Sequence, residues 1–233
     1  MGALYIVSTP IGNLQDITLR AIAVLGEVDF ILCEDTRTSS VLLKSLKENF
    51  PDFKNKARLV SYYEENEQQR IPEVLDLLKK DFSFALISDA GTPAISDPGF
   101  RLIRECVNSD IKVESIPGPS SVLAALTSSG LPTDKFMFVG FLPKKPGHRN
   151  EALKKMKQTL EILPQTVILF ESPFRIKQTM EELQEVFGDI EVVLARELTK
   201  MHEEIRRGKI TELQKHFEKT NPKGEFVVLF NLK

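Results

Sequence analysis

Carboxylate and basic side chains stand together directly after three short apolar runs of the sequence. Such groups can accept a proton from a substrate hydroxyl or hold an anionic substrate in place. They can equally form solvated or ion-paired caps at strand ends, and the residues alone leave both interpretations open. The preferred catalytic set is the first cluster, Glu34 with Asp35 and Arg37. The candidate catalytic residues are Glu34, Asp35, Arg37, Glu171, Arg196, Glu197 and Lys200.

Three loops rich in turn-forming residues also follow apolar runs, at residues 8–14, 88–99 and 116–121. Proline fixes tight bends, and glycine lets a ligand approach the backbone closely. Turn chemistry alone explains any one of these loops. In an open α/β sheet, however, ligands bind at the carboxyl ends of the strands. Three such loops at successive strand ends therefore favour a cleft for a small polar molecule with an anionic end and a flat apolar part.

A basic stretch at residues 144–157 contains six Lys or Arg residues and one Glu. Clusters of this kind neutralise the phosphates of nucleic acid backbones. The functional interpretation is a phosphate-contacting patch on a mobile loop, and the alternative is a solvated helix face. The candidate RNA-binding residues are Lys144, Lys145, Arg149 and Lys154.

Short apolar strands alternate with helical patterns along the whole chain, which is typical of βαβ units and predicts an α/β fold. The first half predicts a largely parallel sheet, and the second half predicts a mixed sheet. The breaker Pro117-Gly118-Pro119 divides the chain into domains 1–116 and 117–233. Strands are expected at 4–7, 29–33, 84–88, 112–116, 136–141, 166–170, 191–195 and 225–230, with a hairpin-like segment at 203–210. Helices are expected at 18–25, 37–48, 65–80, 99–108, 120–129, 149–162, 174–187 and 211–219, with Asp97 as the N-cap of the fourth.

The formal net charge of −2 over 233 residues conceals an asymmetry between the two halves. Residues 1–116 carry 13 basic and 18 acidic side chains, a net of −5, whereas residues 117–233 carry 18 and 15, a net of +3. The acidic half carries the turn-rich loops and the basic half carries the 144–157 stretch, an asymmetry that the function must explain.

Several function classes are not supported by the sequence. It has no Gly-x-Gly, no P-loop, no His-Glu-x-x-His and no Gly-x-Ser-x-Gly motif. The three histidines are widely separated, so no metal is expected. The two cysteines, Cys33 and Cys106, are far apart in the sequence, and reduced thiols are the simpler interpretation. With no apolar run long enough for a membrane span and no basic leader, a cytoplasmic location is expected.

Six motifs, taken in order, resemble a family of bacterial methyltransferases that 2′-O-methylate a cytidine ribose in small-subunit (16S) ribosomal RNA. This family belongs to the tetrapyrrole methylase-like superfamily, and the resemblance covers nearly the whole chain. The motifs are Tyr-Ile-Val-Ser-Thr-Pro-Ile-Gly-Asn-Leu at 5–14, Glu-Asp-Thr-Arg at 34–37, Ser-Asp-Ala-Gly-Thr-Pro at 88–93, Pro-Gly-Pro-Ser at 117–120, Gly-Phe-Leu-Pro at 140–143 and Ala-Arg-Glu-Leu-Thr-Lys at 195–200.

The resemblance implies two α/β domains of the tetrapyrrole methylase type with S-adenosyl-L-methionine held in the cleft between them, and a homodimer acting on the small ribosomal subunit. Family members usually continue into a small C-terminal helical segment, which is expected to be absent here. The cofactor-binding residues that the resemblance implies are Pro10, Gly12, Gly91, Thr92, Pro93, Ile95, Ser120, Ser121 and Leu142.

Two other functions remain open from the sequence. A methyltransferase of the same superfamily could act on a small molecule such as a tetrapyrrole precursor, which would not need the basic stretch. A non-catalytic RNA- or ribosome-binding module would bind RNA without a cofactor site. Cofactor binding distinguishes the second alternative from the methyltransferases. Mapping of ribose methylation distinguishes the first alternative from a methyltransferase that acts on RNA.

Overall fold

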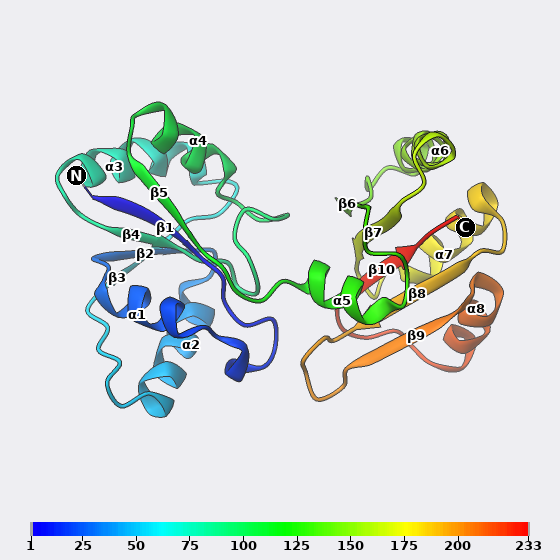
Figure 1. Cartoon of the computed structure of the whole chain (residues 1–233), viewed down its shortest axis with the longest axis horizontal. Helices are drawn as coiled ribbons and strands as arrows, with labels where there is room; N and C mark the ends of the chain where they lie inside the picture. The colour runs from blue at the N-terminus through cyan, green and yellow to red at the C-terminus, as the bar shows by residue number, and fades with distance from the viewer. Residues whose placement is uncertain (1, 233) are drawn as a thin grey trace. The chain divides into compact units, whose positions relative to one another are not determined.

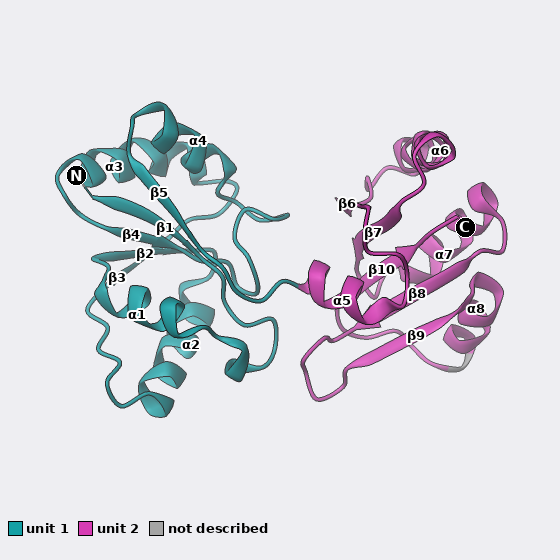
Figure 2. Ribbon diagram, in the orientation of Figure 1, with its two compact units in different colours: residues 1–120 teal, residues 121–233 magenta. Residues whose placement is uncertain are grey.

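The computed structural model describes residues 2–232, apart from the side chain of Lys219. The chain forms two compact units, Met1–Ser120 (unit 1) and Ser121–Lys233 (unit 2), shown in different colours in Figure 2. Each unit has a sheet and core residues of its own. The predicted α/β class, with a parallel sheet followed by a mixed one, is confirmed.

The sheet of unit 1 contains five strands in the order β3-β2-β4-β1-β5, and every neighbouring pair is parallel. Parallel pairing places the carboxyl ends of all five strands at one edge, where residues that follow the strands come together. The central strands are short, continuous apolar runs, as expected for strands covered on both faces. The bounds are β1 (Ala3–Val7), β2 (Phe30–Cys33), β3 (Arg58–Ser61), β4 (Phe84–Leu86) and β5 (Lys112–Ile116).

Two pairs of helices cover the opposite faces of this sheet (Figure 1). One core contains Leu25 of α1 and Leu46 of α2, and the other contains Leu78 of α3 and Leu102 of α4. The side chain of Thr18 accepts a hydrogen bond from Ala21 N and caps α1, and Asp35 caps α2 in the same way. The helices are α1 (Leu19–Glu27), α2 (Thr36–Asn49), α3 (Glu67–Lys79) and α4 (Phe100–Asn108).

The sheet of unit 2 has the order β6-β7-β10-β8-β9. Only the β6–β7 pair is parallel, and the remaining pairs are antiparallel, so the sheet is mixed. The last strand is inserted between β7 and β8 and is buried along its whole length, which ties the C-terminal part of the unit into its centre. The bounds are β6 (Phe136–Phe141), β7 (Thr166–Glu171), β8 (Glu191–Arg196), β9 (Glu204–Lys209) and β10 (Phe226–Phe230).

Three helices pack on one face of this second sheet, and a fourth contacts it at β8 and β10. Leu153, Met180 and Leu213, one from each of the three helices, share a core with alternate residues of the central strands. This alternation follows from the period of two along a strand. The helices are α6 (Pro146–Ile162), α7 (Ile176–Phe187) and α8 (Ile210–Lys219) in the core, and α5 (Ser121–Ser129) against β8 and β10.

Three local expectations from the sequence were wrong. Strand β3 was not expected, because an edge strand of four residues that is only half-buried carries little apolar signal. Helix α4 begins after Gly99, so Asp97 does not cap it. Helix α6 begins at Pro146, a residue favoured in the first turn, so most of the basic stretch is helical rather than a loop.

Cys33 and Cys106 are free, buried thiols that belong to the two separate cores of unit 1. Burial raises the pKa of the Cys106 thiol to about 11. Within residues 2–232, no helix combines the length and apolar character that a membrane span requires.

Candidate functional site

The turn-rich loops of unit 1 are hydrogen-bonded to one another at the carboxyl edge of the parallel sheet. We call residues 8–14, 88–99 and 117–120 the carboxyl-edge loops. Thr9 N donates to Gly91 O at 2.8 Å, and Gly91 N donates back to Thr9 O at 3.1 Å. The Ser8 and Thr92 hydroxyls lie 3.0 Å apart, and Thr92 Oγ1 donates to Pro119 O at 3.1 Å. Three segments far apart in the sequence therefore form one hydrogen-bonded cluster.

The longest of these loops holds several residues in left-handed backbone conformations. Gly91 and Gly99 have φ values of +83° and +140°, and Ala94 and Ser96 both have φ values of +65°. Non-glycine residues rarely adopt this conformation, and it concentrates at functional sites where the surroundings enforce it. The loop is thus held in a defined shape rather than being an ordinary turn.

The predicted cofactor residues of unit 1 all lie on the carboxyl-edge loops. Gly91 and Pro93 are buried, while Ile95 keeps 45% of its surface exposed although it is a large apolar residue. An exposed isoleucine on a loop that also carries hydroxyl groups suits a ligand with one flat apolar part and one polar end. The remaining members, Pro10, Gly12, Thr92 and Ser120, are half-buried or exposed.

Glu34, which directly follows β2, belongs to a cluster of three carboxyl groups with Asp89 and Asp97 of the loop after β4. The Asp89 backbone N–H donates to the Glu34 carboxylate, and Asp35 N donates to Asp89 Oδ1 at 3.3 Å. Burial raises the pKa of Glu34 to about 7, and the charges of Asp97 and Asp89 raise it as well. Burial also raises the pKa of Asp97 to about 6, against the opposing effect of a hydrogen bond with Ser88. Glu34 can therefore exchange a proton near neutral pH.

Asp35 and Arg37 form an exposed ion pair instead of joining this cluster. The Arg37 guanidinium donates to both Asp35 oxygens, with the shortest contact, from Nη2 to Oδ2, at 2.6 Å. Hydrogen bonds from the Arg37 side chain and backbone lower the pKa of Asp35 to about 2. Because 90% of the Arg37 side chain is exposed, its guanidinium remains accessible to an anionic substrate.

Glu171, a predicted catalytic residue of unit 2, is buried and fully engaged within that unit. Thr179 Oγ1 donates to Glu171 Oε2 at 2.6 Å, and Ser172 N donates to Glu171 Oε1 at 2.8 Å. Arg175 Nε lies 3.5 Å from the same Oε1 atom. A carboxylate with this many partners and no exposed surface fixes the start of α7 and does not face solvent.

The other predicted catalytic residues of unit 2 form an ion network at the end of β8. Lys200 Nζ lies 3.1 Å from Glu197 Oε1 and 2.9 Å from Glu225 Oε2. Arg196 Nε lies 3.3 Å from Glu204 Oε2. Burial tends to raise the pKa of Glu197, but the hydrogen bonds from Glu225 N and Lys200 outweigh it, so the net shift is downward. Glu197 is therefore a stable anion here and a weak proton acceptor.

Of the four predicted RNA-binding residues, three have free, exposed ammonium groups and one does not. Lys144, Lys145 and Lys154 are exposed, and within residues 2–232 their side chains have no hydrogen bond or ion pair. Arg149 was predicted to be part of this surface, but only 3% of its side chain is exposed. It forms an ion pair with Glu182 and donates to the carbonyls of Pro143 and Lys144. Arg149 thus joins α6 to α7.

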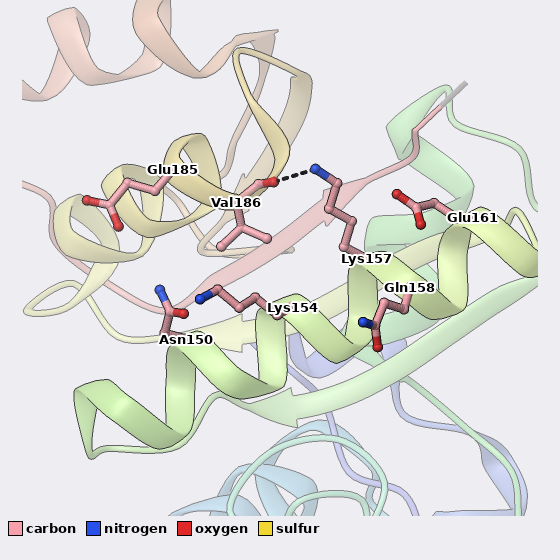
Figure 3. A pocket seen from close by; sticks show the side chains of 7 residues that line it. All are labelled: Asn150, Lys154, Lys157, Gln158, Glu161, Glu185 and Val186. Carbon is pink, nitrogen blue, oxygen red and sulfur yellow. Dashed lines mark hydrogen bonds between the residues drawn. The ribbon is translucent and has the colours of Figure 1, made fainter.

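Lys154 lines a polar groove of about 600 Å³ between α6 and α7 (Figure 3). Asn150 and Gln158 lie on the same stripe of α6 at intervals of four residues, and Glu185 faces them from α7. Lys157 Nζ donates to Val186 O at 2.9 Å and so caps the end of α7. The free ammonium group of Lys154 therefore stands among other polar groups that can hydrogen-bond a ligand.

The two predicted cofactor residues of unit 2 differ in accessibility. Leu142 is buried in the core of the unit, and its carbonyl accepts a hydrogen bond from Arg175 Nη2 at 3.0 Å. Ser121 is the half-buried first residue of α5. No group of three or more His, Cys, Asp or Glu side chains among the described residues is arranged to hold a metal ion.

Sequence reasoning did not single out Ser8, Thr9, Asp89 or Asp97 as site residues, although all four lie in the loops it did select. Ser8 and Thr9 form hydrogen bonds that join the loops, and the charges of the two aspartates raise the pKa of Glu34. A signal in the sequence could have identified the two aspartates. The loop after one apolar run carries two carboxylates, and the residue after another apolar run, Glu34, is a third. Their effect on Glu34 depends on the strand order, which the sequence does not state.

The parallel sheet, the hydrogen-bonded loops at its carboxyl edge and the mixed sheet of unit 2 together define a two-unit α/β protein with a candidate small-molecule site on unit 1. The family model for tetrapyrrole (corrin/porphyrin) methylases matches residues 3–214. The chain belongs to the tetrapyrrole methylase family.

Relatives at high identity carry the name "Ribosomal RNA small subunit methyltransferase I". The protein from Thermotoga maritima is 46% identical over 231 residues, which are 99% of each chain. The protein from Hydrogenobaculum is 47% identical over 98% of this chain and 95% of its own. The protein from Streptococcus pyogenes serotype M1 is 44% identical over 98% of this chain and 76% of its own.

Solved structures share the fold at low sequence identity. A cobalt precorrin-4 methyltransferase superposes with a TM-score of 0.70 and 20% identity, covering 98% of this chain and 94% of its own. Uroporphyrin-III C-methyltransferase from Thermus thermophilus, complexed with S-adenosyl homocysteine, superposes with a TM-score of 0.66 and 18% identity, covering 98% and 97%. These likenesses support the two-unit fold.

Proposed function

We propose that this protein is an S-adenosylmethionine-dependent methyltransferase that methylates the 2′-hydroxyl of a cytidine ribose in small-subunit ribosomal RNA. The observation that carries the proposal is the 46% identity over 231 residues to a protein named as a small-subunit ribosomal RNA methyltransferase. The choice of a ribose hydroxyl on cytidine rests on the six sequence motifs. The carboxyl-edge loops and the Glu34 cluster supply a chemically suitable site.

The carboxyl-edge loops fit S-adenosylmethionine by their chemistry. A Cβ atom on Gly118 would lie 2.9 Å from Ser8 Cβ, and one on Gly91 would lie 3.2 Å from Ile11 Cγ2, so both glycines permit close approach of the loops. Ile95 offers an apolar surface, and the Glu34, Asp89 and Asp97 carboxyl groups favour a cationic ligand. The cofactor supplies a methyl group already activated by its positive sulfonium.

Glu34 is the proposed general base. A ribose hydroxyl is a poor nucleophile unless a neighbouring group accepts its proton during transfer. A carboxylate with a pKa of about 7 is a stronger acceptor than an ordinary carboxylate and is still partly ionised at neutral pH. Arg37, exposed beside it, is the proposed contact for the substrate phosphate or ribose, because a guanidinium binds phosphate in two-pronged geometry.

The free ammonium groups of Lys144, Lys145 and Lys154 are the proposed contacts to the RNA backbone. Their support is exposure and the lack of an internal partner within the described residues, since an already paired lysine gains less from a phosphate. Arg149 is left out of this set because it is buried.

We also propose a homodimer that works in the cytoplasm, where small ribosomal subunits are found. Support for the dimer comes from the family resemblance and from the edge strand β6, whose terminal phenylalanines, Phe136 and Phe141, are 42% and 55% exposed. Sedimentation velocity over a range of concentrations tests it, and a monomer throughout that range would contradict it.

The decisive experiment incubates the protein with methyl-labelled S-adenosylmethionine and small ribosomal subunits that lack the modification, followed by mapping of ribose methylation. We expect label on one cytidine, and substitution of Arg37 by alanine to reduce incorporation more than twofold. Incorporation into a tetrapyrrole precursor but not into RNA would contradict the proposed substrate. RNA binding without any cofactor binding would contradict the proposed enzyme.

A further inference from the structure

Glu67, the first residue of α3, is a charged side chain that the proposed chemistry does not use, and it is only 5% exposed. Tyr62 Oη donates to Glu67 Oε1 at 2.8 Å, and Gly99 N donates to the same oxygen at 3.2 Å. Arg101 Nε lies 3.7 Å from Glu67 Oε2. A buried carboxylate is retained in a fold only when such partners compensate for its lost hydration.

One of these partners is the last residue of the longest carboxyl-edge loop. Gly99 stands at the N-cap of α4 and has no capping side chain, and the Glu67 carboxylate of another helix accepts the Gly99 N–H and places a negative charge at the start of α4. A Cβ atom on Gly99 would lie 2.7 Å from Leu86 Cδ2, so this end of the loop also packs tightly against β4. Asp97 of the carboxyl cluster lies two residues before this anchor.

Tyr62, another partner of Glu67, is hydrogen-bonded to the strand that ends just before the proposed base, Glu34. Tyr62 directly follows β3, and its backbone N–H donates to Cys33 O at 2.8 Å. Cys33 is the last residue of β2 and immediately precedes Glu34. The path from Cys33 through Tyr62 and Glu67 to Gly99 therefore consists of three hydrogen bonds that fix the loop end relative to the end of β2.

We propose that Glu67 is a positioning residue that holds the 88–99 loop in the shape that binds the cofactor. This inference rests on the proposed function. Among residues 2–232, the Glu67 carboxylate has no hydrogen bond or ion pair with a predicted cofactor or catalytic residue, so it acts through Gly99 and Tyr62. Its loss should therefore weaken cofactor binding more than it slows methyl transfer.

The test compares Glu67→Gln and Tyr62→Phe with the control Glu65→Gln, which changes an exposed glutamate just before α3. Calorimetry measures the Kd for S-adenosylmethionine, and initial rates on unmodified small subunits give kcat and the KM for cofactor. We expect Glu67→Gln to raise Kd and KM about tenfold with a smaller change in kcat, because a buried charge-assisted bond is lost. Tyr62→Phe should raise them about threefold, and Glu65→Gln should change neither.

A purely structural role for Glu67 gives a different result. It would lower the melting temperature and the active fraction while leaving Kd and KM at the wild-type values, and that outcome overturns the inference. Because Tyr62→Phe keeps the ring volume, it preserves the test if Glu67→Gln does not fold, and an unchanged Kd in this variant also overturns the inference. Failure of the wild-type protein to bind S-adenosylmethionine would instead overturn the proposed function.

Discussion

Glu34 and Asp35 are neighbours in the sequence with opposite electrostatic environments. Glu34 is half-buried near two further carboxyl groups and has a pKa of about 7, whereas Asp35 is held by Arg37 and has a pKa of about 2. When environments separate the pKa values of two carboxyl groups in this way, the groups are suited to different roles. Glu34 is the one that can gain and lose a proton during a reaction, and Asp35 is a permanent anion.

Replacing Glu34 by glutamine should lower kcat by about 100-fold, because a general base typically contributes a factor of this order or more. In the wild-type protein, kcat/KM should rise with pH and level off above about 7, since Glu34 accepts a proton only when it is ionised. The variant should lack this rise. Initial rates between pH 5.5 and 8.5 measure both effects.

The matched control is Glu27→Gln, which changes an exposed glutamate at the end of α1. It should keep the wild-type rate and pH profile. A Glu34→Gln variant with a normal kcat and a normal pH profile would assign the base to another residue, while its Kd for S-adenosylmethionine separately measures cofactor binding.

At the scale of single elements, the loops at the carboxyl edge of unit 1 depend on close contact between backbones. Gly118→Ala would place a Cβ atom 2.9 Å from Ser8 Cβ. We expect a loss of about 1–3 kcal/mol in the free energy of unfolding, as for other overpacked substitutions, and weaker binding of S-adenosylmethionine. Chemical denaturation and calorimetry measure the two effects.

Gly147 provides the contrast, because a Cβ atom there meets nothing within 4 Å. It lies in the first turn of α6, so Gly147→Ala should leave stability unchanged or raise it by up to about 1 kcal/mol. Equal stability effects at both glycines would show that the Ser8 contact does not constrain the loop.

The ion pair between α6 and α7 should matter for stability rather than for RNA. Arg149→Ala removes the cation that pairs with Glu182, which keeps its hydrogen bond from Gln178, and also removes two hydrogen bonds to backbone carbonyls. We expect a loss of about 3–5 kcal/mol, the usual result of breaking a buried ion pair. Lys145→Ala, four residues earlier and exposed, should leave the denaturation midpoint unchanged. A wild-type midpoint for Arg149→Ala would contradict the structural role.

The elements differ in how well their own residues predict them. Strands β1, β2 and β4 are continuous apolar runs, and the composition of the loops after them was also visible in the sequence. Strand β3 escaped prediction because an edge strand needs little apolar surface. Arg149 was predicted to be a surface cation because its partner, Glu182, lies 33 residues away and is brought to it only by helix packing.

The carboxyl cluster shows the same limit at the site itself. Glu34 and the loop containing Asp89 and Asp97 were both visible as candidates, yet 54 residues separate Asp35 from Asp89, which meet through a hydrogen bond. Only the pairing of β2 with β4 brings them together. Local composition can nominate the parts of such a site, whereas the shifted pKa of Glu34 follows from the strand order.

For the whole molecule, the net charge of −2 gives little information about RNA affinity, because it averages a net of −5 in residues 1–116 with a net of +3 in residues 117–233. A basic surplus of +3 in that half predicts weak binding to bulk RNA. If the proposed function holds, we expect selectivity to come from the shape of the assembled small subunit, or from a dimer that doubles the basic stretch at residues 144–157.

Substituting Lys144, Lys145 and Lys154 together by alanine should weaken binding to the small subunit. The slope of log affinity against log salt should fall by about 2–3, roughly one for each phosphate that is no longer neutralised. The Kd for S-adenosylmethionine should not change. Filter binding at several salt concentrations measures the slope.

Lys155→Ala is the control for this triple variant, because Lys155 is already paired with Glu151 at 2.7 Å. It should keep the wild-type slope. An unchanged slope in the triple variant would remove the three lysines from the RNA contact surface.

The strand order of unit 1 also has a consequence for synthesis on the ribosome. The first strand made, β1, pairs with β4 and β5, so Leu4 has no strand partner before Phe84 is synthesised and Ala3 has none before Lys112. A nascent chain that ends before these residues exposes β1 without a partner, and domains fold as units once their last element has emerged. We therefore expect the nascent chain to become resistant to protease only after β5 has left the exit tunnel, in a single late step.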